Sequence, residues 1–283
     1  ANTGPPTANP DDMDKGNKNI FIGNAAGLLN ETGYKNIFIG NDVGAFGLTA
    51  YENIFIGFAA GFSNDTGYRN IFIGNEAGSR NETAYDNIFI GDGAGFHNET
   101  GLSNTFIGKS AGYYNDNDDE GDATGNSNTF IGWCAGFVNN DGDSNTFVGE
   151  TAGFQNKTGS HNTFIGQSAG YLNETGLRNT FIGAGAGYFN NYDNDGAGHQ
   201  NTFIGNNSGH DNRDGDQNTL VGQAAGYSCN SSGNTLIGYS AGYMLDDNAD
   251  PQGFPDNLKG NTYLGHEAGY SDPGGEKNTY IGK

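Results

Sequence analysis

A short apolar pattern recurs along nearly the whole chain. The motif Asn-[Thr/Ile]-[Phe/Leu/Tyr]-[Ile/Val/Leu]-Gly begins fifteen times between Asn19 and Asn278, and ten of the fourteen spacings equal 17 residues. A full unit reads N-[TI]-F-I-G-x-x-A-G-[FY]-x-N-x-T-G-x-x, and we number its positions 1 to 17 from the asparagine. Such a short, fixed period indicates a repeat protein whose units must stack to bury their apolar residues.

The unit predicts one strand and one tight return. Positions 1 to 5 are rich in β-branched and aromatic residues and end in Gly, which is typical of a strand, and the repeated glycines disfavour a helix. The Asn-x-Thr-Gly segment predicts a turn. We therefore expect an all-β fold, a narrow parallel β-solenoid of about fifteen 17-residue rungs. Residues 1–18 would form an extended arm and 19–283 one repeat domain, with insertions near 114–127, 189–200 and 244–260.

The run N-T-F-I-G-x-x-A-G resembles a known repeat. It is similar to the S-V-A-I-G-x-x-A repeats in YadA-like heads of trimeric autotransporter adhesins, and to N-T-A-I-G repeats in phage-tail-fibre-like proteins. The likeness covers residues 19–283. It implies a left-handed parallel β-roll, often trimeric, that serves adhesion or forms a shaft. This chain differs in its longer unit and in the aromatic residue at position 3.

Charge and composition narrow the function. The chain has 33 acidic and 12 basic side chains, for a net charge of −21, so it repels phosphate backbones and we expect no nucleic-acid partner. Its apolar runs are far shorter than the roughly 20 residues that cross a bilayer, so we expect no membrane insertion. The histidines occupy unrelated unit positions and no catalytic constellation emerges, so an enzyme is not expected. The acidity and the initial Ala1 favour an extracellular or cell-surface location.

Side-chain alternation leaves one apolar ladder outside the coil. Position 3 faces away from positions 2 and 4, yet all three are largely apolar. If position 4 fills the core, position 3 is exposed; if position 3 fills it, a Thr/Ile column beside an Ile column is exposed. Unless the rest of the coil covers it, such a stripe is an interface. The candidate interface is position 3, namely Phe21, Phe38, Phe55, Phe72, Phe89, Phe106, Phe130, Phe147, Phe164, Phe181, Phe203, Leu220, Leu236, Tyr263 and Tyr280.

Acidic inserts suggest calcium as a cofactor. Two of them fit [DN]-x-D-x-[DE]-G, which places oxygen ligands at alternate positions before a turn-forming Gly, as a short Ca²⁺ loop requires. The alternative is a solvated acidic turn. The candidate ligands are Asp116, Asp118, Glu120 and Asp122, then Asn191, Asp193 and Asp195, and in a weaker version Asp141 and Asp143.

Asn-x-Thr triplets recur at positions 12 to 14. They could accept N-linked glycans in a secreted protein, although turn chemistry explains them equally well. The candidate glycosylation sites are Asn30, Asn64, Asn81, Asn98, Asn156 and Asn173.

Three functions remain open. The leading hypothesis is an extracellular structural protein that assembles head to tail into a surface filament, with the arm of one copy pairing beside the terminal rung of the next. The first alternative is a trimeric adhesin head or fibre shaft that binds a surface or a glycan. The second is an ice-binding protein with Thr repeated on each rung, against which position 2 is Ile in the first five units. In the first two cases the main partner is a second copy of the chain.

Overall fold

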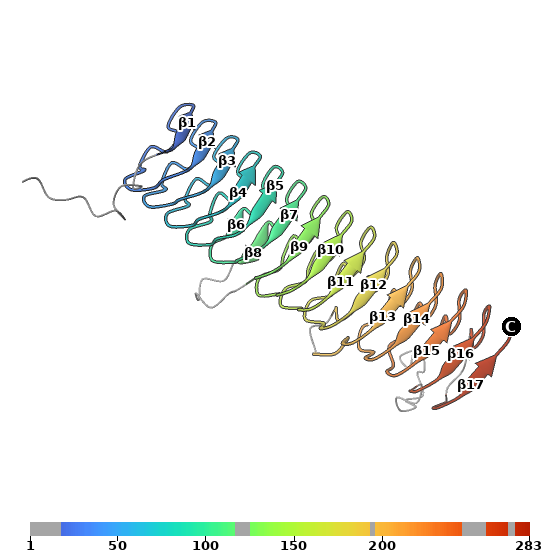
Figure 1. Ribbon diagram of the computed structural model, residues 1–283. Coiled ribbons are helices and arrows are strands. Elements are labelled where there is room, and N and C mark those ends of the chain that lie inside the picture. The colour runs from blue at the N-terminus through green and yellow to red at the C-terminus, as the bar shows by residue number, and fades with distance from the viewer. Residues whose placement is uncertain (1–17, 117–124, 193–195, 245–258, 271–274) are drawn as a thin grey trace, which may run out of the picture.

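The protein is a rod of stacked coils, each contributing one strand to a single parallel sheet (Figure 1). The computed structural model describes residues 18–116, 125–192, 196–244, 259–270 and 275–283. The sheet contains β1 (Ile20–Ile22), β2 (Ile37–Ile39), β3 (Ile54–Ile56), β4 (Ile71–Ile73), β5 (Ile88–Ile90), β7 (Thr105–Ile107), β9 (Thr129–Ile131), β10 (Thr146–Val148), β11 (Thr163–Ile165), β12 (Thr180–Ile182), β13 (Thr202–Ile204), β14 (Thr219–Val221), β15 (Thr235–Ile237), β16 (Thr262–Leu264) and β17 (Thr279–Ile281). A second, two-stranded sheet pairs β6 (His97–Asn98) with β8 (Tyr114–Asp116).

Every strand of the long sheet pairs with the equivalent positions of its neighbour. The register continues through the longer spacings, where Thr105 lies opposite Thr129 and Thr235 opposite Thr262. The longer spacings therefore add residues between the strands of the long sheet and do not change its register. The predicted all-β parallel β-solenoid is confirmed, with fifteen strands and about fourteen turns.

Position 3 fills the core. The rings of Phe38 and Phe55 stack with centroids 4.8 Å apart and planes 1° apart, and similar contacts continue along the rod. Position 8, mostly alanine, packs in the same cluster. A coil this narrow holds one large side chain per turn, and the small residue opposite leaves room for it.

The prediction that position 3 is an exposed interface is therefore wrong for the interior of the rod. These side chains have no exposed surface, because the parallel in-register sheet stacks each ring directly on the next. Only the first and last members of the ladder are exposed, Phe21 at 37% and Tyr280 at 42%. The buried members are Phe38, Phe55, Phe72, Phe89, Phe106, Phe130, Phe147, Phe164, Phe181, Phe203, Leu220, Leu236 and Tyr263.

Four left-handed residues turn each coil. In the fourth coil Gly74, Glu76, Gly78 and Asp86 have φ values of 143°, 52°, 58° and 61°. At position 9, a Cβ on Gly78 would lie 2.5 Å from the nearest carbon of the Phe72 ring, so only glycine fits there. Residues at positions 7 and 17 also have positive φ values, although they are usually not glycine. The sequence did not indicate this left-handed conformation.

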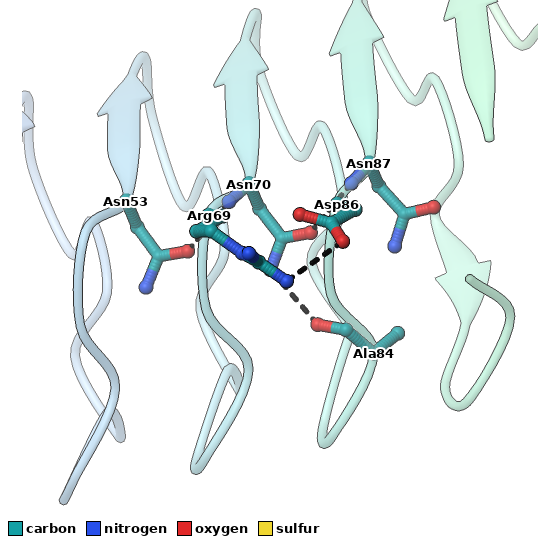
Figure 2. A network of polar contacts seen from close by, with 6 residues as sticks. All are labelled: Asn53, Arg69, Asn70, Ala84, Asp86 and Asn87. Carbon is teal, nitrogen blue, oxygen red and sulfur yellow. Dashed lines mark hydrogen bonds and ion pairs between the residues drawn. The ribbon is translucent and has the colours of Figure 1, made fainter. Parts of the chain in front are cut away.

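Two columns of buried asparagines run along the rod, at position 1 and at position 12, where Gly47 and Cys229 interrupt the second column. At position 1, Asn70 donates from Nδ2 to the Ala84 carbonyl at 2.8 Å, and its Oδ1 accepts the Asn87 backbone N–H at 3.0 Å (Figure 2). At position 12, Asn81 Nδ2 donates to the same carbonyl at 3.0 Å and to Asn64 Oδ1 of the preceding coil at 2.6 Å. These amides join positions within a coil and also join successive coils, so the polar part of the core is hydrogen-bonded.

Candidate functional site

Positions 2 and 4 of the long sheet form the outer sheet face. Of the two arrangements that alternation left open, the structure has the one with Phe inside and the Thr/Ile and Ile columns outside. Position 2 is Ile in β1–β5 and Thr in the ten later strands. Position 4 is an aliphatic residue throughout, and several members are more than a third exposed, such as Ile165 at 40% and Leu264 at 44%. This face is the most regular surface that the chain offers to a partner.

A row of charged residues lies immediately before the isoleucine strands. At position 17, Lys35 Nζ lies 2.9 Å from Glu52 Oε1, and Arg69 Nη2 lies 2.9 Å from Asp86 Oδ2 (Figure 2). These exposed pairs add little to the free energy of unfolding, since solvent screens them. They do fix an alternating order of charge along this part of the rod.

Tyrosines at position 16 stack beside this row. Tyr34, Tyr51, Tyr68 and Tyr85 have successive ring centroids 4.5–5.0 Å apart. The Arg69 guanidinium carbon lies 5.0 Å from the Tyr68 ring centroid, within range of a cation–π contact. The first coils therefore carry apolar, aromatic and paired ionic columns side by side.

A longer aromatic ladder follows position 10. Its rings stack face to face with centroids 4.8–5.4 Å apart and planes within 18° of parallel. Because the rings cover one another's faces, only their edges can meet a ligand. Burial raises the pKa of Tyr113, Tyr188 and Tyr227 above the usual value of 10, so these phenols stay neutral to a higher pH than exposed tyrosines do. The ladder comprises Phe96, Tyr113, Phe137, Phe154, Tyr171, Tyr188, His210, Tyr227, Tyr243 and Tyr270.

Sequence reasoning missed three of these features, namely the position-10 ladder, the tyrosine stack and the charge row. The aromatic preference at position 10 was visible in the repeat and could have identified the first. The tyrosines and the charge row are confined to the first coils, so a consensus over all units hides them.

The candidate calcium ligands divide between described and undescribed segments. Asp118, Glu120, Asp122, Asp193 and Asp195 lie outside the described residues.

The described calcium candidates contact the preceding coil. Asp116 Oδ2 accepts from the Thr100 backbone N–H at 2.5 Å, and Asn191 Oδ1 accepts from the Thr175 N–H at 2.8 Å. Asp143 Oδ1 accepts a backbone N–H at 2.6 Å, and Asp141 is the fourth described candidate. Within the ranges that the structure describes, no three His, Cys, Asp or Glu side chains lie close enough together to hold a metal ion.

The candidate glycosylation sites are turn residues. Each Asn Nδ2, the atom that would carry a glycan, donates to the carbonyl three residues later, as in Asn64 to Gly67 at 2.9 Å. Five of the side chains are fully buried, so a glycan at these sites is incompatible with the folded coil, and the turn interpretation holds. These five are Asn64, Asn81, Asn98, Asn156 and Asn173, while Asn30 in the first coil is half-buried and makes the same bond at 3.2 Å.

The cysteines and histidines form no shared site. Cys134 and Cys229 are both free and buried, and burial raises the pKa of the Cys134 thiol, so it resists ionisation. His97 stacks on Tyr114 within the small sheet, whereas His210 stacks in the position-10 ladder.

No helix that is long and apolar enough to cross a membrane occurs in the described part of the chain. No protein-family model, no curated protein and no solved structure matches this chain.

Proposed function

We propose that this chain is an extracellular structural protein that forms filaments by stacking its coils end to end. The main observation behind this proposal is that the same interface between successive coils repeats along the rod. Strands pair at equal positions, position-3 side chains stack, and each position-1 Asn Oδ1 accepts the N–H of the next coil's Asn. A coil is therefore complementary to a copy of itself, and the same contacts can join two molecules.

The first and last described coils carry equivalent positions. Among the described residues the Phe21 ring stacks on Phe38 at 5.0 Å, and the Tyr280 ring contacts Tyr263 at 4.9 Å. Stacking Tyr280 on the Phe21 of another copy would cover both rings. Asn278 Oδ1 would then accept the Asn19 N–H, as every equivalent asparagine does inside the rod.

Electron microscopy of negatively stained protein, with sedimentation velocity, tests end-to-end stacking. We expect filaments of the wild type, and single rods of Phe21→Glu, because stacking would bury an unpaired carboxylate. The control is Asn24→Glu, an exposed side chain of the same coil, which should leave filaments intact. Wild-type protein that stays as single rods at every concentration would exclude the proposal, as would filaments from Phe21→Glu.

Calcium binding by the acidic inserts is part of this proposal. The support is the spacing of oxygen ligands in two separate inserts. Isothermal titration of chelator-treated protein with Ca²⁺ should show heat that Asp118→Asn with Asp193→Asn removes. A flat wild-type titration would reject calcium as a cofactor.

A second candidate function is ice binding by the later strands. The observation that favours it is the outward direction of position 2, which places ten threonines in register on a flat sheet from β7 to β17. A methyl and a hydroxyl repeated about every 4.8 Å present a regular surface to ordered water. Thermal hysteresis that falls in Thr163→Tyr, which disturbs the flat face, would support this function. An absence of hysteresis in the wild type would reject it.

A further inference from the structure

The outer sheet face contains a wholly apolar block. Strands β1–β5 carry isoleucine at both outward positions; the eight side chains in β2–β5 are half-buried in the single chain, and Ile20 and Ile22 in β1 are 50% and 56% exposed. From β7 onward position 2 is threonine, so the block has a defined end. The block consists of Ile20, Ile22, Ile37, Ile39, Ile54, Ile56, Ile71, Ile73, Ile88 and Ile90.

The charge row runs beside this block. Lys35, Glu52, Arg69 and Asp86 each precede the first strand residue by two positions, in β2, β3, β4 and β5 respectively, and their signs alternate about a point between β3 and β4. Lys18 holds the same place before β1. The four alternating charges sum to zero and Lys18 adds one positive charge, in a chain of net charge −21, so two copies can approach here without the repulsion that operates elsewhere.

We infer that the isoleucine block is a docking surface for a second copy of this chain, in which the two rods lie antiparallel about a two-fold axis. The axis runs parallel to the strands and passes between β3 and β4. It places β3 opposite the partner's β4 and β2 opposite the partner's β5. The isoleucines of one sheet then face those of the other, as in the packing of two sheets in a β-sandwich.

Charge order selects this arrangement. The axis places Lys35 opposite the other copy's Asp86, and Glu52 opposite the other copy's Arg69, so the facing charges are of opposite sign. Lys18 then faces the neutral Ser103. If the two-fold axis ran along the rod instead, the charge row would meet position 6. Opposite β2–β5 that column is Asn41, Phe58, Asn75 and Asp92, so three of the charges would meet neutral residues and Asp86 would face another carboxylate.

The size of the surface sets the expected strength. The axis between β3 and β4 overlaps six strands of each copy, β1–β5 and β7, and at about 4.8 Å per strand and about 3.3 Å for each of three residues the face measures roughly 29 by 10 Å. This is roughly 290 Å² per copy before the charged and aromatic border is added, below the roughly 800 Å² per partner of a standard interface, so we expect a dissociation constant weaker than micromolar. The dimer would cross-link rods laterally, and it does not depend on end-to-end stacking.

Sedimentation velocity over a concentration series measures this dimer. All proteins carry Phe21→Glu so that end-to-end stacking is absent. We expect self-association, and Ile71→Lys beside the two-fold axis should raise the dissociation constant at least tenfold. The matched control is Thr180→Lys, an equivalent substitution in β12, which should change it less than twofold.

Inverting the charge row tests the antiparallel register. The combined variant Lys35→Glu, Glu52→Lys, Arg69→Asp, Asp86→Arg keeps both ion pairs within the chain and the net charge. We expect it to dimerise with itself like the wild-type row but not with the wild-type row, since like charges would then face each other. Equal mixing of the two would overturn the register. Association unaffected by Ile71→Lys, or a protein still monomeric at about 1 mM, would overturn the docking surface. Neither result depends on whether filaments form.

Discussion

At position 9, the missing side chain makes room for the core ring. Gly95 has φ of 60°, and a Cβ there would lie 2.5 Å from carbons of the Phe89 ring. Gly93, two residues earlier, has φ of 63°, but its Cβ would approach no buried core ring, and its nearest neighbour would be the edge of the Tyr113 ring at 3.2 Å. The backbone conformation is the same at both glycines. Comparing substitutions at the two positions therefore separates the energetic cost of a left-handed residue from the cost of overpacking the core.

We expect Gly95→Ala to lower the free energy of unfolding by about 2–4 kcal/mol, because the methyl group displaces the buried ring. Gly93→Ala should cost about 1 kcal/mol, the cost of the left-handed conformation alone. Position 7 carries alanine in other coils, for example Ala59 with φ of 50°. Urea unfolding of both variants measures the difference. Equal losses would mean that contact with Phe89 does not dictate the glycine.

The asparagine column at position 12 has a gap in the second coil. Gly47 occupies the position, and its backbone N–H bonds the Gly44 carbonyl as the N–H of Asn30 bonds Gly27. The gap leaves Asn30 Oδ1 buried with no hydrogen-bond partner among the described residues. In other coils the next asparagine's Nδ2 fills this role, as Asn81 does for Asn64.

Gly47→Asn should therefore raise the free energy of unfolding. The new amide can donate to Asn30 Oδ1, and its own oxygen can accept from Asn64 Nδ2, for a gain of about 1–2 kcal/mol. Gly47→Ala is the control, since it restricts the unfolded chain equally but adds no amide. Thermal and urea unfolding compare the two. The proposal about the column fails if the asparagine variant is no more stable than the alanine variant.

At the scale of the element, the sequence predicted the strand but not its inner face. The period of 17 residues placed every strand of the long sheet, because a five-residue motif bounded by glycine has few other conformations. Alternation could not decide between Phe38 and Ile39, since both are apolar. The decision comes from volume, because the glycine at position 9 leaves a slot that a flat ring fills. Non-glycine left-handed residues such as Lys35 carry no signal in their side chains.

The small β6–β8 sheet contains a titratable group with a shifted pKa. His97 in β6 stacks on Tyr114 at a centroid distance of 4.9 Å, and its Nδ1 is buried and makes no hydrogen bond within the part of the chain that the structure describes. Burial, and after it the charge of Arg80, lower the pKa of His97 below 6.5. The unfolded chain thus binds this proton more readily than the folded one. Neutral His97 therefore contributes fully to the free energy of unfolding above pH 6.5, and this contribution is lost as the pH falls towards the pKa of the folded state.

We expect His97→Gln to remove this acid-side loss. Glutamine occupies the same unit position at Gln155 and carries no titrating proton. The free energy of unfolding of the variant, relative to wild type, should therefore rise as the pH falls from about 7.5 to 5. Urea unfolding at several pH values measures this difference, in which the shared carboxylate titrations cancel. A difference that is independent of pH would show that His97 does not couple to folding.

Over the described length of the rod, each strand of the long sheet pairs only with the strands of the two adjacent coils. Strand pairing, ring stacking and asparagine bonds all join one coil to the next, and the same positions are used each time. Stability in such a rod is close to a sum of coil and interface terms. Whole coils can then be added or removed without loss of the fold, whereas equivalent positions of successive coils must stay aligned.

Removing one whole coil tests that independence. Deletion of residues 145–161 would place β9 beside β11, so Thr129 would pair with Thr163 and the Phe130 ring would meet the Phe164 ring in the register used throughout. We expect a folded rod shorter by about 4.8 Å, with a thermal midpoint within a few degrees of wild type. Deletion of residues 145–153 is the control. Removing about half a coil would place the strand of one coil beside the non-strand part of the next, so that backbone amides are buried without hydrogen bonds. Circular dichroism during heating distinguishes the two variants. If the whole-coil deletion unfolds as readily as the half-coil deletion, long-range contacts rather than nearest neighbours hold the rod together.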